Sequence, residues 1–268
     1  MSVYLNRRRL ASTMPVDETF LIYGDSGSGK TFLSSTFPKT EERPLAYVNI
    51  LEDGIGSAEL GDKKMIEVVD LERFEEVDEF FTDVYNGYTV AEDGTKVPML
   101  FSSIVIDSAT NLEFLIKKYI KESSNKQQMS IQLWGQKLDT DETLYSLMKS
   151  LSRKLGIPIV IIAHTKKISD DDNPQFNKEI PSLQEKTARS LAAKTSFVWF
   201  TKVEFETSVV NGKAIKEVGH YTYINTHPYL LTKARKPASM ELPQKIKNLS
   251  YETFKKNVLD KLNTKENE

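Results

Sequence analysis

The sequence predicts an α/β fold built on a mainly parallel β-sheet flanked by helices, with antiparallel strands on the C-terminal side. Four short apolar runs, at residues 19–23, 45–51, 101–107 and 157–163, have the length and character of buried strands. They alternate with helical segments of about 10 to 20 residues, a pattern typical of parallel sheets. Two stretches of alternating apolar and polar residues surround Asn211-Gly212, a turn sequence typical of an antiparallel hairpin.

The chain divides into three expected parts: a polar lead-in arm at residues 1–17, the core at 18–245, and a C-terminal helix with a charged tail at 246–268. We expect helices at about 30–37, 71–85, 109–121, 135–155 and 251–262, and a short strand at 65–69. The turn pairs Asn86-Gly87 and Asp93-Gly94 bracket a predicted β-hairpin. The polar stretches 123–130 and 165–183 are expected to be loops, the second without structure of its own.

The composition is that of an ordinary globular protein, and it excludes several kinds of site. The 268 residues carry a formal net charge of −2, so there is no overall basic field for nucleic acid and any polyanion site must be local. The absence of cysteine excludes disulfides and zinc–thiolate sites and fits a reducing cytoplasm. The longest apolar run, 157–163, is too short to cross a bilayer, so we expect no membrane partner. Arg7-Arg8-Arg9 precedes no apolar segment, which argues against a secretory signal; the triplet fits a solvated tail, and the functional alternative is a phosphate contact or a subunit-docking arm.

The first predicted strand leads into Gly24-Asp25-Ser26-Gly27-Ser28-Gly29-Lys30-Thr31, which matches G-x-x-x-x-G-K-[ST] at every position. Glycines allow backbone angles at which successive N–H groups point inward and bind phosphate oxygens, and the helix that follows adds its positive end. Lys30 is expected to reach the β- and γ-phosphates, and the Thr31 hydroxyl is expected to bind Mg²⁺. The sequence therefore predicts an ATP–Mg²⁺ site at residues 24–31, and the adjoining Phe32 is counted in the nucleotide-binding set.

Polar residues end three other predicted strands, and in a parallel sheet the carboxyl ends of the strands meet at one edge. Asp107 follows four apolar residues and is expected to orient Mg²⁺. Glu52 can activate the water that attacks the γ-phosphate, although one residue of slippage would give that role to Asp53. His164 can contact the γ-phosphate; its alternative is an ordinary buried histidine.

The order of these residues resembles the core of RecA-type P-loop ATPases, most closely the short RecA-like nucleotide-binding proteins of bacteriophages associated with single-strand annealing and recombination. The resemblance covers about residues 19–236 and implies a cytoplasmic ATPase, in the host cell if phage-encoded, with Glu52 as catalytic base and His164 as γ-phosphate sensor. It also implies that two loops, 123–134 and 165–183, bind single-stranded DNA. Their candidate contacts are Lys126, Lys166, Lys167, Phe176 and Lys178.

Lys233-Ala234-Arg235 is a second part of the resemblance. RecA-like ATPases that form rings or filaments often place such a pair late in the core, where it reaches the γ-phosphate of the neighbouring subunit. Side chains two apart on an extended segment point the same way, as joint contact requires. The resemblance therefore implies a homo-oligomer that shares nucleotide between subunits, with single-stranded DNA and a single-stranded DNA-binding protein as further partners. A solvated basic pair is the alternative.

Two other functions remain open at the level of sequence. The run Asp170-Asp171-Asp172 would repel a nucleic acid backbone, so the 165–183 segment could instead bind protein in a nucleotide-dependent switch or scaffold. A small-molecule kinase would share the phosphate loop, but no arginine-rich lid is evident.

Overall fold

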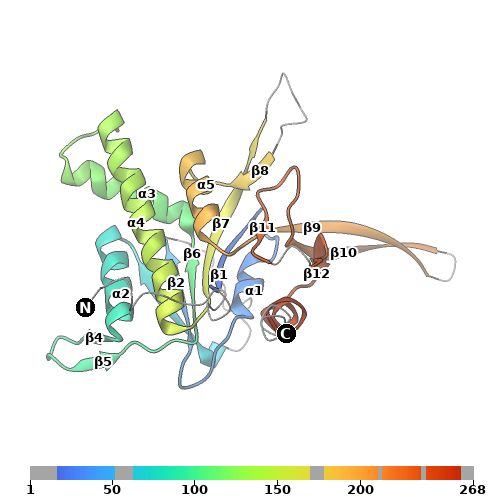
Figure 1. Ribbon diagram of the computed structural model, residues 1–268, viewed down its shortest axis with the longest axis horizontal. Coiled ribbons are helices and arrows are strands. Elements are labelled where there is room, and N and C mark those ends of the chain that lie inside the picture. Colours follow the sequence, from blue (N-terminus) through green and yellow to red (C-terminus); the bar gives the residue numbers. More distant parts are fainter. Residues whose placement is uncertain (1–16, 52–62, 170–177, 211–212, 237–239, 261–268) are drawn as a thin grey trace, which may run out of the picture.

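The computed structural model describes residues 17–51, 63–169, 178–210, 213–236 and 240–260 (Figure 1). For residues 208–210 and 213–215 it describes the backbone alone. A ten-stranded sheet runs through it in the order β12-β10-β9-β1-β7-β6-β2-β3, with β11 on β9 and β8 on β7. The parallel strands are β1 Thr19–Gly24, β2 Leu45–Ile50, β3 Ile66–Leu71, β6 Ser103–Asp107, β7 Ile159–Ile168 and β9 Phe197–Val210. The antiparallel ones are β8 Lys178–Pro181, β10 Lys213–Tyr223, β11 Lys233–Ala234 and β12 Lys245–Lys247. The predicted fold class is confirmed.

Helices cover both faces of the sheet (Figure 1). One face carries α2 Phe74–Asn86, α3 Ala109–Ser123, α4 Ile131–Leu155 and α5 Glu185–Lys194. The other carries α1 Lys30–Ser35 and α6 Tyr251–Phe254, which continues as one π-helical segment, Lys255–Leu259. A short 3₁₀ turn, Lys63–Met65, precedes β3. Strands β1, β2 and β6 and the first half of β7 are buried on both faces, which explains why their sequences read as unbroken apolar runs, whereas β3, at the edge of the sheet, is partly exposed.

Local signals set the ends of the long helices. Ser108 accepts a hydrogen bond from Asn111 N (3.3 Å) at the start of α3, and Ser130 accepts one from Leu133 N (3.3 Å) at the start of α4. Gly156 ends α4 in the left-handed conformation (φ 66°), where a glycine carries no steric penalty. Helix α4 therefore begins at Ile131, earlier than predicted from the apolar pattern.

The two predicted hairpins are confirmed. Strands β4 Tyr88–Val90 and β5 Lys96–Pro98 form a separate antiparallel pair. Strand β10 pairs antiparallel over its whole length with Phe200–Val210 of β9, and the two strands form an arm that projects from the body (Figure 1), although the predicted turn residues Asn211-Gly212 lie outside the described residues.

The 165–183 segment was predicted to lack structure, and this prediction is wrong for its described part. Strand β7 continues to Ile168 and pairs with β8, from Thr165 opposite Pro181 to Ile168 opposite Lys178. Backbone hydrogen bonds between the two strands hold this ribbon together. The polar side-chain pattern of the segment carries no signal of that pairing, so the sequence did not predict the ribbon. Residues 170–177, with the acidic run and Phe176, lie outside the described residues. Helix α5, which follows the ribbon, was not predicted.

In the part of the chain described here, no helix combines the length and the apolar character needed to span a bilayer.

Candidate functional site: the phosphate loop and its surroundings

Strand β1 ends at Gly24, and α1 begins at Lys30, so residues 25–29 form a loop at the carboxyl edge of the sheet. Gly27 (φ 74°) and Gly29 (φ 93°) both adopt left-handed backbone angles, as a loop of inward-pointing N–H groups requires. At Gly24 the reason for glycine is different. A Cβ there would lie 2.3 Å from the carbonyl oxygen of Thr201 on β9, so only glycine lets the two strands approach.

Lys30 lies over this loop rather than in solvent. Its Nζ donates hydrogen bonds to Gly24 O (3.0 Å) and Asp25 O (2.7 Å), and the residue is only 7% exposed. A buried ammonium held by carbonyl oxygens can exchange them for phosphate oxygens without entering a new environment. The geometry fits the predicted role of Lys30 in binding the β- and γ-phosphates.

Thr31 and Asp107 are brought together by a residue that the sequence did not reveal. The hydroxyl of Tyr47, on β2, donates to Asp107 Oδ2, and the side chains of Thr31 and Ser34 lie close enough to the same phenol to lower its pKa. Burial raises the pKa of Tyr47 well above its usual range, and the charge of Asp107 raises it further, so the phenol stays protonated and remains a donor. In the sequence Tyr47 is one apolar residue of a buried strand, and nothing in the pattern marks it.

The residues present fit a magnesium–triphosphate site. A threonine hydroxyl and a carboxylate are oxygen ligands of the kind that Mg²⁺ takes, and Mg²⁺ usually completes its shell with substrate phosphates and water. Among the described residues, no cluster of three or more His, Asp or Glu side chains could hold a metal alone. Thr31 and Asp107 would therefore hold the ion together with a bound nucleotide.

His164 lies at this edge, as predicted. It is the β7 partner of Gly24, and its backbone N donates to Thr110 Oγ1 (3.2 Å) at the start of α3. Glu52 lies outside the described residues. The last residue of its strand, Ile50, accepts a hydrogen bond from Asn111 Nδ2 (2.9 Å), which places the end of β2 beside α3.

Lys233 and Arg235 lie away from the phosphate loop. Lys233 pairs with Val198 on β9, three residues before Thr201, and thus about 10 Å toward the amino edge of the sheet. Its Nζ donates to three carbonyls at the end of α5: Ala192 (2.9 Å), Ala193 (3.1 Å) and Thr195 (2.7 Å). Burial lowers its pKa, and the charges of Arg235 and Lys149 lower it further.

Arg235 takes part in a different cluster. Its Nη1 lies 3.5 Å from the buried carboxylate of Asp17, which also receives a two-pronged contact from Arg153 and lies 3.7 Å from Lys149. The geometry thus separates the basic pair from its own chain's phosphate loop.

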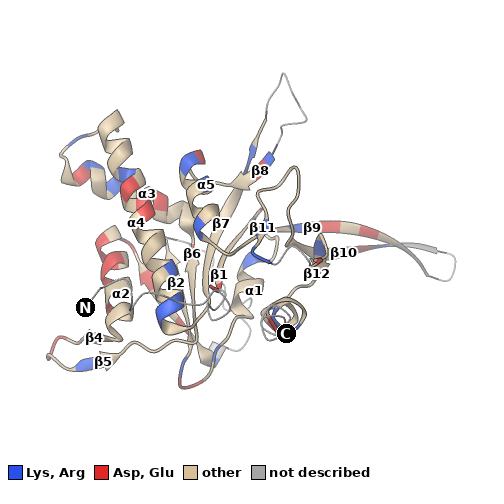
Figure 2. Cartoon of the chain, in the orientation of Figure 1, with Lys and Arg blue, Asp and Glu red and all other residues tan. Residues whose placement is uncertain are grey.

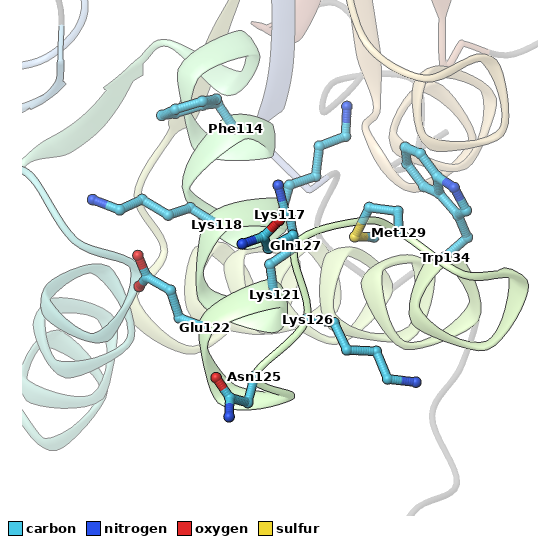
Figure 3. Close-up of a pocket in the computed structure, with 10 residues that line it drawn as sticks. All are labelled: Phe114, Lys117, Lys118, Lys121, Glu122, Asn125, Lys126, Gln127, Met129 and Trp134. Atoms are coloured by element: carbon cyan, nitrogen blue, oxygen red, sulfur yellow. The ribbon is translucent and has the colours of Figure 1, made fainter.

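Lys126 belongs to a lysine-rich groove that the sequence did not reveal as a unit (Figure 3). The groove, about 750 Å³, lies between α3 and the start of α4, and its lysines are Lys117, Lys118, Lys121 and Lys126. Two aromatic rings border it: Phe114, which is 58% exposed, and Trp134, whose ring lies 5.1 Å from Lys117 Nζ. Lys117, Lys118 and Lys121 lie on successive turns of α3, so their signal was an i, i+3, i+4 spacing of charge, whereas Lys126 lies in the connection between α3 and α4.

The lysines of the β7–β8 ribbon lie in two different surroundings. Lys166 Nζ donates to Leu183 O and is thereby held against the body. Lys167 and Lys178 instead line a cavity of about 350 Å³ together with Lys202, Tyr223 and Tyr229. Figure 1 shows that this ribbon and the α3–α4 turn both project beyond the carboxyl ends of the parallel strands.

Comparison with known proteins adds one finding. A family model described as AAA domain matches residues 17–236, which span the sheet from β1 to β11 and include the phosphate loop and Asp107. The match supports the binding and hydrolysis of a nucleotide. No curated protein matches the chain.

Proposed function

The chain belongs to the AAA domain family, and from this premise we propose that it is a RecA-like, Mg²⁺-dependent ATPase that oligomerises and binds single-stranded DNA in phage-type recombination, annealing or replication. The observation that carries the ATPase part is that the Tyr47 hydroxyl donates a hydrogen bond to Asp107 and lies beside Thr31 of the phosphate loop. It brings a phosphate cradle and a metal-binding pair to one edge of the sheet.

Each residue at this edge has a task in hydrolysis. The loop N–H groups and Lys30 bind phosphate oxygens, and they stabilise the negative charge that develops on the transferring group. Glu52 accepts the proton of the attacking water, and His164, beside Gly24, contacts the γ-phosphate. Bound Mg²⁺ supplies positive charge that neutralises the phosphates.

The lysine-rich groove is the surface that best supports single-stranded DNA binding. Four lysines can neutralise phosphates along a strand, and the rings of Phe114 and Trp134 offer faces on which bases stack. Figure 2 shows basic residues on α3, whereas acidic residues mark the β9–β10 arm. A strand in the groove would lie at the same end of the molecule as Lys167 and Lys178 of the ribbon.

The position of Lys233 and Arg235 supports oligomerisation. The pair lies toward the amino edge of the sheet, so any contact with a γ-phosphate must be made to the nucleotide of another subunit. Such a contact requires a head-to-tail interface, which generates a ring or a filament.

One set of measurements tests the ATPase activity, its stimulation by DNA and the oligomeric state. ATP hydrolysis is measured with and without oligo-dT, alongside the mass in solution, for the wild-type protein, for Lys30→Ala and for the control Lys216→Ala. We expect hydrolysis that DNA stimulates, loss of hydrolysis in Lys30→Ala, and no effect of Lys216→Ala on the exposed arm. Wild-type protein that hydrolyses no ATP would contradict the proposal.

DNA binding is tested separately by fluorescence anisotropy of labelled oligo-dT. The double variant Lys121→Ala/Lys126→Ala should weaken binding and reduce its salt dependence, and Trp134→Ala should weaken it with the salt dependence unchanged. Lys186→Ala, a lysine on α5 outside the groove, serves as the control. Binding that none of the groove variants alters would remove the groove from the proposal.

A nucleotide-dependent switch or scaffold is the alternative function, and the acidic run at 170–172 favours it. It predicts nucleotide binding without any affinity for oligo-dT, a result that the same anisotropy titration would give directly.

A further inference from the structure

The strand order determines where the nucleoside of a bound triphosphate can lie. The phosphate loop follows β1; β7 and β6, which carries Asp107, lie on one side of β1, and β9 and β10 lie on the other. Since the metal and the terminal phosphate belong on the Asp107 side, the opposite end of the nucleotide must leave the loop toward β9 and β10. A nucleoside site is therefore expected on the β9–β10 side of the phosphate loop.

A cavity of about 560 Å³ lies on that flank, within the usual size range of small-ligand sites. The phosphate loop and α1 form one wall, and β9, β10 and the segment 248–250 form the others. Its lining residues are Ser28, Gly29, Phe32, Leu33, Thr36, Thr201, His220, Thr222, Asn248, Leu249 and Ser250.

We propose that this cavity holds the nucleoside, with the ring of Phe32 against the base and the side-chain amide of Asn248 on the base edge, and that it prefers adenine. The inference rests on the proposed binding of a nucleotide at the phosphate loop. Phe32, already in the predicted nucleotide-binding set, thereby contacts the base, and Asn248 is a new residue that no sequence motif supplied.

Phe32 is suited to stacking. It directly follows Thr31, and its side chain is 59% exposed although its neighbour Leu33 is buried in the core. A large exposed ring beside a phosphate site offers a flat apolar face to a base, and such stacking tolerates any base. Phe32 therefore contributes affinity rather than selectivity.

Asn248 is suited to distinguishing one base from another because contacts to β10 and to α1 fix the position of its segment. Its backbone is left-handed (φ 50°), and its N donates to His220 O (2.8 Å). Leu249 is buried, and Tyr251 N donates to Thr36 Oγ1 (2.9 Å), which ties the next turn to α1. An amide offers one donor and one acceptor and can pair with the N6 amino group and a ring nitrogen of adenine, whereas guanine presents two acceptors along the corresponding edge.

His220 connects this wall to the phosphate loop. Its Nδ1 lies 3.3 Å from Ser28 O, and a Cβ on Gly29 would come within 3.1 Å of the same ring nitrogen. The base wall and the loop are thus in direct contact, as expected if one molecule occupies both.

Titration calorimetry with Mg²⁺ and three probes, ATP, GTP and inorganic tripolyphosphate, tests the assignment. We expect wild-type protein to bind ATP more tightly than GTP. Phe32→Ala should weaken binding of both nucleotides roughly tenfold and leave tripolyphosphate unchanged. Asn248→Ala should weaken ATP and bring the ATP and GTP affinities together, with tripolyphosphate again unchanged.

Matched controls are available for both variants. Phe205→Ala removes another exposed phenylalanine, on the arm, and Asn86→Ala removes another exposed asparagine, at the end of α2. Both controls should bind all three probes as the wild type does.

The outcomes separate the two levels of inference. Wild-type protein that binds neither ATP nor tripolyphosphate would overturn the proposed function, and the pocket with it. Tripolyphosphate binding with no effect of Phe32→Ala or Asn248→Ala on ATP would overturn the pocket alone, and equal wild-type affinities for ATP and GTP would overturn the adenine preference.

Discussion

The hydroxyl of Tyr47 donates a hydrogen bond to Asp107 at the end of β6, and the side chain of Thr31 in the phosphate loop lies beside the same hydroxyl. Tyr47 and Asp107 lie 60 positions apart in the sequence, on adjacent parallel strands. Removing the hydroxyl leaves the ring in the core and takes one hydrogen bond from the Asp107 carboxylate. We therefore expect Tyr47→Phe to weaken the apparent Mg²⁺ affinity for nucleotide binding by about tenfold, as loss of a residue that orients a metal ligand commonly does.

Tyr23→Phe is the control for Tyr47→Phe. Tyr23 is also a buried strand tyrosine, but its hydroxyl bonds Glu179 O (3.0 Å) and Leu231 N (2.8 Å). If both variants shift the Mg²⁺ titration equally, the effect of Tyr47 is general to the core and not specific to Asp107.

The glycines of the phosphate loop should differ in what they tolerate. Gly27 has no atom within 4 Å of a built Cβ, so the cost of Gly27→Ala is the left-handed backbone alone, about 1–2 kcal/mol, and Gly27→Asn should recover part of it. At Gly24 the obstacle is the backbone of β9, so Gly24→Asn should be worse than Gly24→Ala. Thermal unfolding of the four variants measures this. The same order of Ala and Asn at both positions would contradict the steric explanation.

Lys137 is expected to stabilise the fold strongly. Fully buried in α4, its ammonium contacts Glu113, Asp141 (2.7 Å) and Thr187 Oγ1 (2.8 Å), and so joins α3, α4 and α5. Lys137→Met would leave two buried carboxylates without their cation and should cost about 3–5 kcal/mol in the free energy of unfolding. Denaturant unfolding measures the loss. Arg189→Met, which breaks an exposed ion pair with Glu185, should cost less than about 1 kcal/mol.

Glu18 should make stability depend on pH. Burial raises its pKa, against the opposing effect of the hydrogen bond from Tyr251, so the folded state binds its proton more tightly than the unfolded state. This contribution is complete below the unfolded-state pKa and is lost as the pH rises through the folded-state pKa. Glu18→Gln keeps an acceptor for Tyr251 and cannot ionise, so its melting temperature should exceed that of the wild type at pH 7 and approach it at acidic pH. A difference in melting temperature between Glu18→Gln and the wild type that is the same at every pH would contradict this role of Glu18.

Subunit mixing tests the basic pair. Arg235→Ala subunits keep Lys30, and Lys30→Ala subunits keep Arg235. A shared site is therefore intact where the phosphate loop of an Arg235→Ala subunit meets Arg235 of a neighbouring Lys30→Ala subunit. A random 1:1 mixture should regain about a quarter of wild-type ATPase activity. Arg153→Ala is the matched control, since it also removes a partner of Asp17 and should stay active alone. An inactive mixture in which co-assembly of the two variants is verified would rule out sharing through Arg235.

Most of the fold could be predicted because its signals are local. The apolar runs of β1, β2, β6 and β7 and the turn residues of both hairpins specify elements within a few positions. The β7–β8 ribbon could not be predicted in this way. It depends on pairing between segments separated by residues 170–177, and polar side chains carry no mark of that pairing.

The candidate site divides along the same line. The phosphate loop, Lys30, Thr31 and Asp107 could be predicted from the sequence alone, because their chemistry is written in consecutive residues and in one strand end. The folded structure was needed to show that the Tyr47 hydroxyl lies beside both Asp107 and Thr31, that Asn248 and Phe32 line one cavity, and that Lys233 and Arg235 lie away from their own phosphate loop. The physical reason is that these relationships depend on which strands become neighbours, and strand order is fixed by the packing of the whole core.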